Sequence, residues 1–279
     1  MKETKAETLQ IKKLHPFEGH PFKVADNEEM DQLVESIQAQ GVLTPLVVRP
    51  LNNGEYEVIS GHRRLHACKR AGIETVPAMI TEMDRDAAAI ALVDSNLHRE
   101  HILPSEKAFA YKLKMDALNR QGTSRQVGEK LSVTQISEVT EDSERQIHRY
   151  IRLTNLIPEI LQMVDDGRIA LTPAVELSYL TKWEQKDLLE TMESEDCTPS
   201  LSQAMTLKAA SQTRELNMDR IFDIMTQPKP NQQERIRFDI SDIRKFFPKN
   251  YTTAKIQKTI YQLLENYQRT WKRSDRNDR

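Results

Sequence analysis

The sequence has few cysteines, glycines and aromatic residues, and it has no long apolar run. Two cysteines, Cys68 and Cys197, are too few for a disulfide framework in 279 residues, which indicates a reducing compartment. With 8 glycines and 6% aromatic residues, a β-sandwich or barrel is disfavoured and helix-rich domains are favoured. The apolar stretches are too short for a membrane span or a signal peptide, so we expect a cytoplasmic protein that does not associate with membranes.

The charge is nearly balanced over the whole chain but differs between its parts. The formal net charge is -2, yet residues 231–279 contain 12 Lys and Arg against 6 Asp and Glu. This end therefore carries +6 and the remainder carries -8. The basic character is local, and we expect the terminal tail to add at most a non-specific contact with phosphates.

Strand and helix patterns alternate in the first hundred residues, whereas helical patterns dominate after Pro104 and only RIRFDI, residues 235–240, could form a further strand. β-branched runs predict strands over residues 9–14, 45–50, 56–60 and 75–81. Apolar residues at helical spacing predict helices over residues 28–41, 61–72 and 84–97.

These patterns predict three regions. We expect an α+β domain over residues 1–102, an all-α domain over residues 103–225, and a small, mainly helical C-terminal region over residues 226–279. Pro228 and Pro230 stand in a polar stretch that is typical of a linker.

The strand YEVIS turns directly into a helix at Gly61, in the stretch ISGHRRLHACKRAG. Such a helix presents unpaired backbone N–H groups and the positive end of its dipole, which favour an anion. Arg63 and Arg64 add guanidinium groups that suit phosphate oxygens. Two other interpretations stay open. One is an ordinary helix with solvated arginines, and the other is a metal site on His62 and His66, which lacks the glutamate of the zinc-protease helix.

A second polar cluster, DSNLHREH, ends a later predicted helix that should return to the same edge of the sheet. Its Asn96 is a neutral oxygen ligand for a hard cation, and Arg99 is a further phosphate partner. The alternative is a polar helix terminus that precedes a linker. Taken with the first cluster, this arrangement favours an anion site at the ends of two helices.

The order and spacing of these motifs resemble the ParB/RepB family of partition proteins over roughly residues 8–180. The similar segments are HPFEGHPFKV, ESIQAQGVLTPLVVRP, GEYEVISGHRRLHACKRAGIETVPAMI, VDSNLHREHILPSEKAFAY and RYIRLTNLIPEILQMVDDGRIALTPAVELSYL. The resemblance implies a ParB/sulfiredoxin-like α+β domain, then an all-α helix-turn-helix domain and a small helical C-terminal region. We expect a plasmid or mobile-element type of partition protein.

The resemblance also implies that the N-terminal domain binds CTP with a magnesium ion (Mg2+). In the family, a Gly-x-Arg-Arg motif holds the triphosphate, and a Glu-Asn-x-x-Arg motif serves phosphate and metal. The segment after the first helix lies near the cytosine. The matching nucleotide-binding positions are Thr44, Pro45, Gly61, His62, Arg63, Arg64, Ser95, Asn96 and Arg99, with Asn96 as the metal ligand.

Three positions depart from the family pattern. His62 and Ser95 each stand where the family has glutamate, and His20-Pro21-Phe22 stands where it has Gln-Pro-Arg. The arginines and the asparagine remain available for phosphates, but two carboxylates that could orient metal or water are absent. We therefore expect CTP to bind and any CTPase activity to be weak.

A helix-turn-helix pattern lies in VTQISEVTEDSERQIHRYIRL. Ile136 and Val139 can face Ile147 and Ile151 across a tight turn, in which Thr140 takes the place of the usual glycine. The second helix carries basic residues and has no acid beyond its first turn, which suits phosphates and base edges. The alternative is a plain helical hairpin with solvated charges. The predicted DNA-binding residues are Thr134, Gln135, Ser143, Arg145, Gln146, His148, Arg149 and Arg152.

The resemblance implies a CTP-dependent clamp on double-stranded DNA at an inverted-repeat, centromere-like site. Such a protein acts as a homodimer in segregation of a plasmid, mobile element or chromosome, together with a ParA-type ATPase. The apolar stripe from Ile256 to Trp271 is expected either to form the dimer contact or to pack within the chain.

Two other functions stay open at this point. The chain could be a transcriptional regulator whose N-terminal domain no longer responds to nucleotide. It could also be a small-molecule kinase or a sulfiredoxin-like enzyme, because these share the N-terminal architecture. Sulfiredoxin chemistry requires a cysteine in the Gly-His-Arg turn, whereas Cys68 lies on the apolar side of the helix, where packing is its expected role.

Overall fold

The computed structural model divides the chain into two compact units, Met1–Gln227 and Pro228–Arg279. It describes residues 4–99, 101–121, 133–138, 140, 142–227, 243–248 and 250–277. The predicted linker at Pro228 and Pro230 and the further strand suggested at residues 235–240 lie outside the described residues. The predicted domain boundary at residue 102 falls inside the first unit and stays a prediction.

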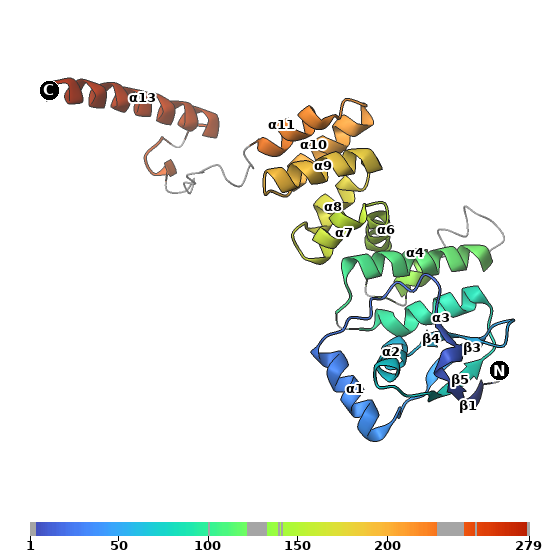
Figure 1. Cartoon of the computed structure of the whole chain (residues 1–279). Helices are drawn as coiled ribbons and strands as arrows, with labels where there is room; N and C mark the ends of the chain where they lie inside the picture. Colours follow the sequence, from blue (N-terminus) through green and yellow to red (C-terminus); the bar gives the residue numbers. More distant parts are fainter. Residues whose placement is uncertain are drawn as a thin grey trace. The chain divides into compact units, whose positions relative to one another are not determined.

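The first hundred residues form a mixed α+β domain, which confirms the predicted fold class (Figure 1). Its five strands are β1 (Thr4–Gln10), β2 (Leu14–Pro16), β3 (Leu46–Pro50), β4 (Tyr56–Ser60) and β5 (Thr75–Thr81). Its helices are α1 (Glu28–Gln40), α2 (His62–Arg70) and α3 (Arg85–Leu97). Asn27 and Asp84 cap α1 and α3 with their side chains, as the sequence predicts for Asp84.

The sheet has the strand order β1-β5-β3-β4-β2, so the first two strands lie at opposite edges. The prediction of one strand over residues 9–14 is wrong, because a 3-10 turn, η1 (Ile11–Lys13), separates β1 from β2. The few residues between Gln10 and Leu14 span at most about 14 Å, whereas five flat strands span about 19 Å. The sheet must therefore curl until its edges approach each other.

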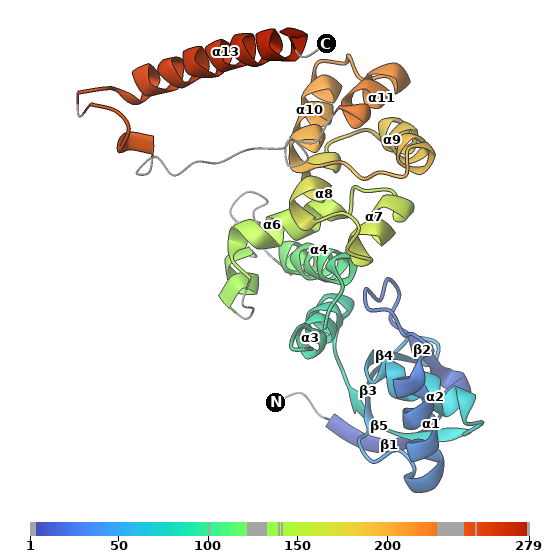
Figure 2. The same ribbon diagram turned by 90° about the vertical axis from the view of Figure 1, so that its left-hand side faces the viewer.

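Alternate residues of the strands pack in two different clusters with helices. The helices α1, α2 and α3 that contribute to them lie around the strands in Figure 2. Val48 and Val58 pack in a cluster with residues of α1 and α2. Their neighbours Val47 and Ile59 face a second cluster, which contains residues of α3 and of the following helix α4 (Pro104–Gln121). This period of two puts the two clusters on opposite faces of the sheet.

The rest of the first unit is helical, as predicted. After α4 come helical residues 133–138, α6 (Glu144–Leu153), α7 (Pro158–Asp165), α8 (Leu171–Leu177), α9 (Lys182–Ser194), α10 (Leu201–Gln212) and α11 (Met218–Thr226). Ile136 and Ile147 are buried in one cluster with Tyr111 of α4, and Ile151 packs against it. The predicted helix-turn-helix contact is thus confirmed for these residues, whereas Val139 lies outside the described residues.

Three aspartates from three different elements bind to α4. Asp94 of α3 pairs with the buried ammonium of Lys114, and Asp165 of α7 accepts hydrogen bonds from Ser105 N and Oγ at 2.9 and 2.6 Å. Asp142, just before α6, accepts from Lys107 Nζ at 2.9 Å and from the Tyr111 hydroxyl. These contacts fix α4 between the α+β domain and the other helices.

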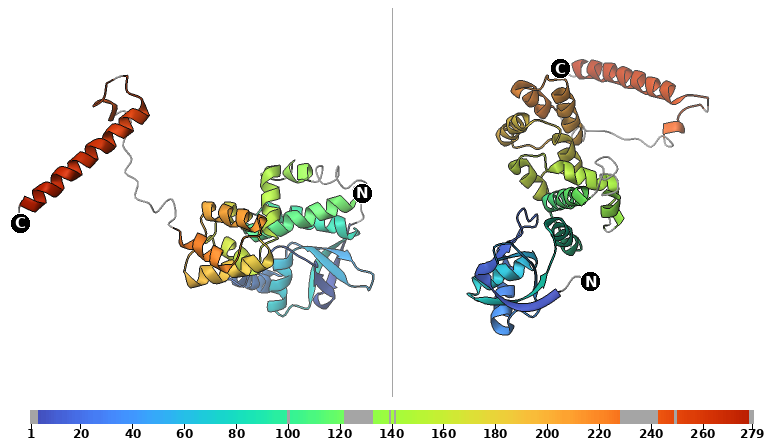
Figure 3. Two further views of the ribbon diagram at one scale, coloured as in Figure 1. Left: turned by 90° about the horizontal axis from the view of Figure 1, so that it is seen from above. Right: turned by 90° about the vertical axis from the view of Figure 1, so that its right-hand side faces the viewer.

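In the second unit, α13 (Thr253–Asn277) is one uninterrupted helix (Figure 3, red). Ile256 is buried, but four apolar residues of its predicted stripe and flank are 58% to 72% exposed. These residues are Tyr261, Leu263, Leu264 and Tyr267. These four side chains are therefore not covered by the described residues of the second unit. No helix among the described residues is long and apolar enough to cross a membrane.

Candidate functional site

The start of α2 has the features that the sequence predicts for an anion site. Gly61 precedes the helix with φ at 102°, a left-handed conformation that favours glycine. A Cβ atom at this position would lie 3.1 Å from Leu46 Cγ and 3.2 Å from Arg64 Nη2. No side chain caps α2, and its first turn contains no acidic residue. Its first amides are thus available to an anionic ligand.

The two arginines of α2 have different surroundings. Arg64 Nη1 donates to the backbone carbonyls of Thr44 and Pro45, at 2.9 Å for Pro45, and burial lowers its pKa. The structure therefore brings the predicted cytosine segment against α2. Arg63 Nη2 donates to Glu29 Oε2 at 3.0 Å in a partly exposed ion pair that a stronger anion can replace.

His62 is part of the wall of the site in this structure. It is 9% exposed, its Nε2 accepts from Phe17 N at 3.5 Å, and its ring centroid lies 3.8 Å from that of His20. The pKa of His62 is lowered to about 3. Burial is the main cause, and electrostatic repulsion from His20 and Arg99 contributes in the same direction. His62 is thus neutral at physiological pH, unlike the glutamate that it replaces.

The end of α3 supplies the second cluster. Ser95 Oγ and Asn96 Nδ2 both donate to the carbonyl of Leu92, at 2.9 and 2.8 Å, and Asn96 is buried. Arg99 lies over the ring of Phe22, 5.4 Å from its centroid. Partial burial lowers the pKa of Arg99, Glu106 opposes this shift, and the charge of Arg63 adds to it. Arg63 and Arg99 are thus close enough to repel each other, and an anion between them would relieve that repulsion.

The loop between β2 and α1 also belongs to the site. In the sequence, only its position in the family pattern, where His20-Pro21-Phe22 replaces Gln-Pro-Arg, indicated this. His20 Nδ1 donates to the carbonyl of Phe22 at 2.7 Å, while its Nε2 is buried without a hydrogen-bond partner among the described residues. Burial lowers the pKa of His20. Because His20 contacts α2 and Phe22 contacts Arg99, this loop joins the two clusters.

Neither a metal site on His62 and His66 nor a reactive thiol is supported by these residues. His66 pairs with Asp26 at 2.8 Å. No group of three His, Cys, Asp or Glu side chains that could hold a metal occurs within the described ranges. Cys68 is fully buried, and burial raises its pKa, so it is not a thiolate nucleophile here.

The predicted DNA-binding residues lie on or near the outer face of α6. Ser143 caps the helix, with Oγ accepting from Gln146 N at 3.4 Å. Arg145 and His148 are exposed, as is Gln135 on the preceding helical residues. Thr134 Oγ1 donates to Glu144 Oε1 at 2.7 Å. These side chains present polar groups at the start of α6, where recognition helices contact base edges.

Two of the predicted arginines are held by neighbouring helices. Arg149 Nη2 donates to Thr172 Oγ1 at 2.6 Å. Arg152 donates to the carbonyl of Ser178 at 2.9 Å and lies 3.8 Å from the ring centroid of Tyr179. Arg152 is therefore more suited to support the surface than to contact a base.

A groove of about 760 Å³ runs along this face. Besides residues of α6, it is lined by Lys112 and Met115 of α4, and by Val175 and Tyr179. Sequence analysis missed Lys112 and Tyr179, because no local pattern brings α4 or the end of α8 beside α6. Five cationic or histidine side chains and one carboxylate line the groove, so its field favours a polyanion.

Comparison with known proteins gives consistent similarities. The family model of the ParB N-terminal domain matches residues 1–97. The probable chromosome-partitioning protein ParB of Vibrio cholerae is 28% identical over 85% of this chain and 77% of that protein. The probable chromosome 1-partitioning protein ParB of Deinococcus radiodurans is 34% identical over 61% of this chain and 55% of that protein.

One solved structure is also similar to this chain, at a lower level of similarity. It is the C-terminally truncated chromosome-partitioning protein ParB of Caulobacter crescentus, complexed to the centromeric parS site. The TM-score is 0.43 and the sequences are 22% identical, over 74% of this chain and 99% of that chain.

Proposed function

Because this chain belongs to the ParB family, we propose that it is a partition protein that binds a specific site on double-stranded DNA. The observation that carries this proposal is the basic groove along α6, with the N-terminal turn of the helix open to solvent. Arg145, Gln146 and Ser143 are the proposed base readers, whereas Lys112 and Arg149 are proposed to contact phosphates.

We propose that the ends of α2 and α3 hold the triphosphate of CTP. The free amides after Gly61 would donate hydrogen bonds to the phosphates, and Arg63 and Arg99 would neutralise their charge. Thr44 and Pro45, which Arg64 holds beside α2, would contact the base. The residues present fit a nucleoside triphosphate in both charge and backbone geometry.

The fit to Mg2+ is weaker than the fit to phosphate. Asn96 uses its amide nitrogen for internal hydrogen bonds, so its Oδ1 would be the protein ligand, and the phosphates would supply others. His62 is buried and neutral, and Ser95 bonds to its own helix, so neither replaces a glutamate as a base. We therefore propose nucleotide binding with slow hydrolysis.

We further propose that the protein acts as a homodimer in the cytoplasm, on an inverted repeat, with a ParA-type ATPase as partner. The exposed apolar stripe of α13 supports the dimer, because such a surface is stabilised by a second copy. The positions of two recognition helices on one inverted repeat require a twofold arrangement.

A second function, a regulator that does not respond to nucleotide, is favoured by two observations. The guanidinium of Arg64 is already bonded to two backbone carbonyls, and Phe22 stands where the family pattern has an arginine. Both features reduce the number of cations available to a triphosphate.

The test selects duplex DNA from a random library with the purified full chain, and then titrates CTP with Mg2+ by calorimetry. We expect an inverted repeat, heat of CTP binding, and CTP-dependent retention on closed circular DNA that carries the site. Arg145→Ala is expected to lose the DNA site but keep the CTP heat. Site-specific binding without any CTP heat or retention would support the regulator instead, and no site selection would refute the DNA-binding proposal.

A further inference from the structure

The loop between β2 and α1 contacts four helices through three of its residues. The ring of His20 contacts that of His62 at the start of α2, and Phe22 lies under Arg99, just after the end of α3. Lys23, the next residue, contacts α4 and α7. The loop is therefore a direct physical connection between the candidate nucleotide site and the helices that support α6.

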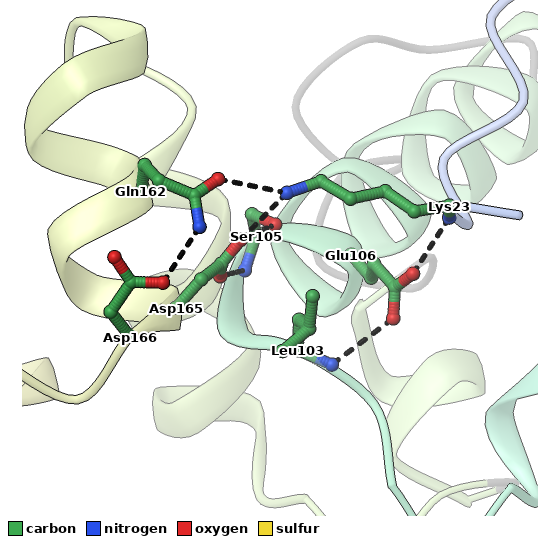
Figure 4. Close-up of polar contacts among 7 residues, drawn as sticks. All are labelled: Lys23, Leu103, Ser105, Glu106, Gln162, Asp165 and Asp166. Carbon is green, nitrogen blue, oxygen red and sulfur yellow. Dashed lines mark hydrogen bonds and ion pairs between the residues drawn. The ribbon is translucent and has the colours of Figure 1, made fainter. Parts of the chain in front are cut away.

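Figure 4 shows how Lys23 makes this connection. Its backbone N–H donates to Glu106 Oε1 at 2.7 Å, and its ammonium donates to Asp165 Oδ2 at 3.1 Å and Gln162 Oε1 at 3.3 Å. Glu106 Oε2 accepts from Leu103 N at 3.1 Å. One residue of the loop thus binds both the start of α4 and the end of α7.

The two acidic residues that bind Lys23 are buried, so the strength of each contact depends on the exact position of Lys23. The side chain of Asp165 is 2% exposed, whereas that of Lys23 is 54% exposed. Asp165 also accepts two hydrogen bonds from Ser105, so it stays satisfied when the ammonium leaves. The Lys23 ammonium can therefore leave while the Asp165 carboxylate keeps two hydrogen bonds, and the loss of the cation makes the free energy of this contact sensitive to its geometry.

The same segment of α4 reaches the DNA-binding side. Lys107, which follows Glu106, donates to Asp142 at 2.9 Å, and the Tyr111 hydroxyl donates to the same carboxylate. Asp142 directly precedes Ser143, the N-cap of α6. A shift of α4 at its start is thereby transmitted to the first turn of the recognition helix.

We infer that Lys23 is a positioning residue that couples the nucleotide site to the DNA-binding helices. This inference rests on the proposed function, since it requires both ligands. A nucleotide that draws Arg99 away from Phe22 moves the loop, and the loop moves the Lys23 ammonium relative to Asp165. Nucleotide and DNA then influence each other because each ligand changes the free energy of the same contact.

The test measures the affinity for the selected DNA site with and without saturating CTP and Mg2+, and the affinity for CTP with and without that DNA. The coupling factor is the affinity for DNA with CTP divided by the affinity for DNA without it. The corresponding ratio for CTP, with and without DNA, must have the same value. Lys23→Ala removes the ammonium but keeps the backbone bond to Glu106. Lys13→Ala, an exposed lysine of η1, is the matched control, and Lys23→Arg is the conservative variant.

We expect Lys23→Ala to bind each ligand alone within about 2-fold of wild type and to reduce the coupling factor about 5-fold, as for a partly exposed charged contact. Lys23→Arg should restore most of the factor, and Lys13→Ala should not change it. Asp165→Asn should reduce the factor by a similar amount, with no further loss in the double variant.

Retained coupling in Lys23→Ala, or an equal loss in Lys13→Ala, would overturn the inference. It would also be overturned by a wild-type protein that binds both ligands with a coupling factor of 1. A wild-type protein that fails to bind CTP would refute the proposed nucleotide function itself, which calorimetry detects independently of any variant.

Discussion

Acidification is expected to destabilise this protein through His62. The ring is buried beside His20 and Phe17, and its pKa is lowered to about 3 by burial. In the unfolded chain the pKa of a histidine is about 6.5. Below that pH the unfolded chain takes up a proton that the folded protein excludes until about pH 3. The stability that neutral His62 provides is therefore complete above the unfolded pKa and decreases as the pH falls towards 3.

The size of this effect follows from linkage. Each pH unit below the unfolded pKa costs about 1.4 kcal/mol per excluded proton. Between about pH 7.5 and about pH 5, the single ring of His62 therefore lowers the free energy of unfolding by about 2 kcal/mol. The pKa of His20 is also lowered by burial, so its contribution has the same sign.

The assay compares urea unfolding of wild type, His62→Gln and His98→Gln over this pH range, followed by circular dichroism. His98 is an exposed histidine of the same domain. We expect wild type and His98→Gln to lose about 2 kcal/mol more than His62→Gln on acidification. The His62 ring resonances should also show no titration by NMR above about pH 5. Equal pH dependence of wild type and His62→Gln would refute the reasoning.

Three further predictions concern other parts of the structure. Gly61→Ala places an alanine in a left-handed conformation, with its Cβ 3.1 Å from Leu46 Cγ. The free energy of unfolding in urea should therefore fall by about 1 to 3 kcal/mol, and an unchanged value would show that the position is not strained. Gln185→Leu removes hydrogen bonds to the backbone of Ile157 and Leu180, at 2.7 and 2.9 Å, whereas the Asn155 carbonyl keeps Lys182; the loss should cost about 2 kcal/mol or more in thermal or urea unfolding. Lys112→Ala should reduce the slope of the logarithm of the DNA association constant against the logarithm of the salt concentration by about 0.9, without changing the preference for one DNA sequence over another. Arg145→Ala should lower the discrimination between the specific site and other DNA by about 1 to 3 kcal/mol. A loss of sequence preference in Lys112→Ala, or a change in salt slope alone in Arg145→Ala, would contradict the assigned roles.

Local chemistry made much of the fold predictable. The glycine that opens α2, the aspartate that caps α3 and the proline that opens α7 each act within one turn of their own position. The pairing of β3 with β4 follows from the turn-rich connection between them. The same is true of the pairing between Ile136 and Ile147, because a helix-turn-helix joins neighbours in sequence.

Contacts between distant segments were not predictable in this way. The position of β2 beside β4 depends on the curl of the whole sheet, which no window of residues contains. Lys23 and Asp165 are 142 positions apart, and nothing in the two segments that contain them indicates that they meet. The cation on each face of Tyr179, from Arg152 and Lys208, likewise depends on how α6, α8 and α10 pack.

The attachment of α4 has a practical consequence for protein engineering. Its donors serve Asp94, Asp142 and Asp165, which belong to segments on both sides of any junction near residue 102. A chimaera that takes the first domain from one homologue and the recognition helix from another separates donors from acceptors wherever it is cut beside this helix. We therefore expect DNA specificity to be transferred only when α4 and the three aspartates that it binds come from the same parent protein.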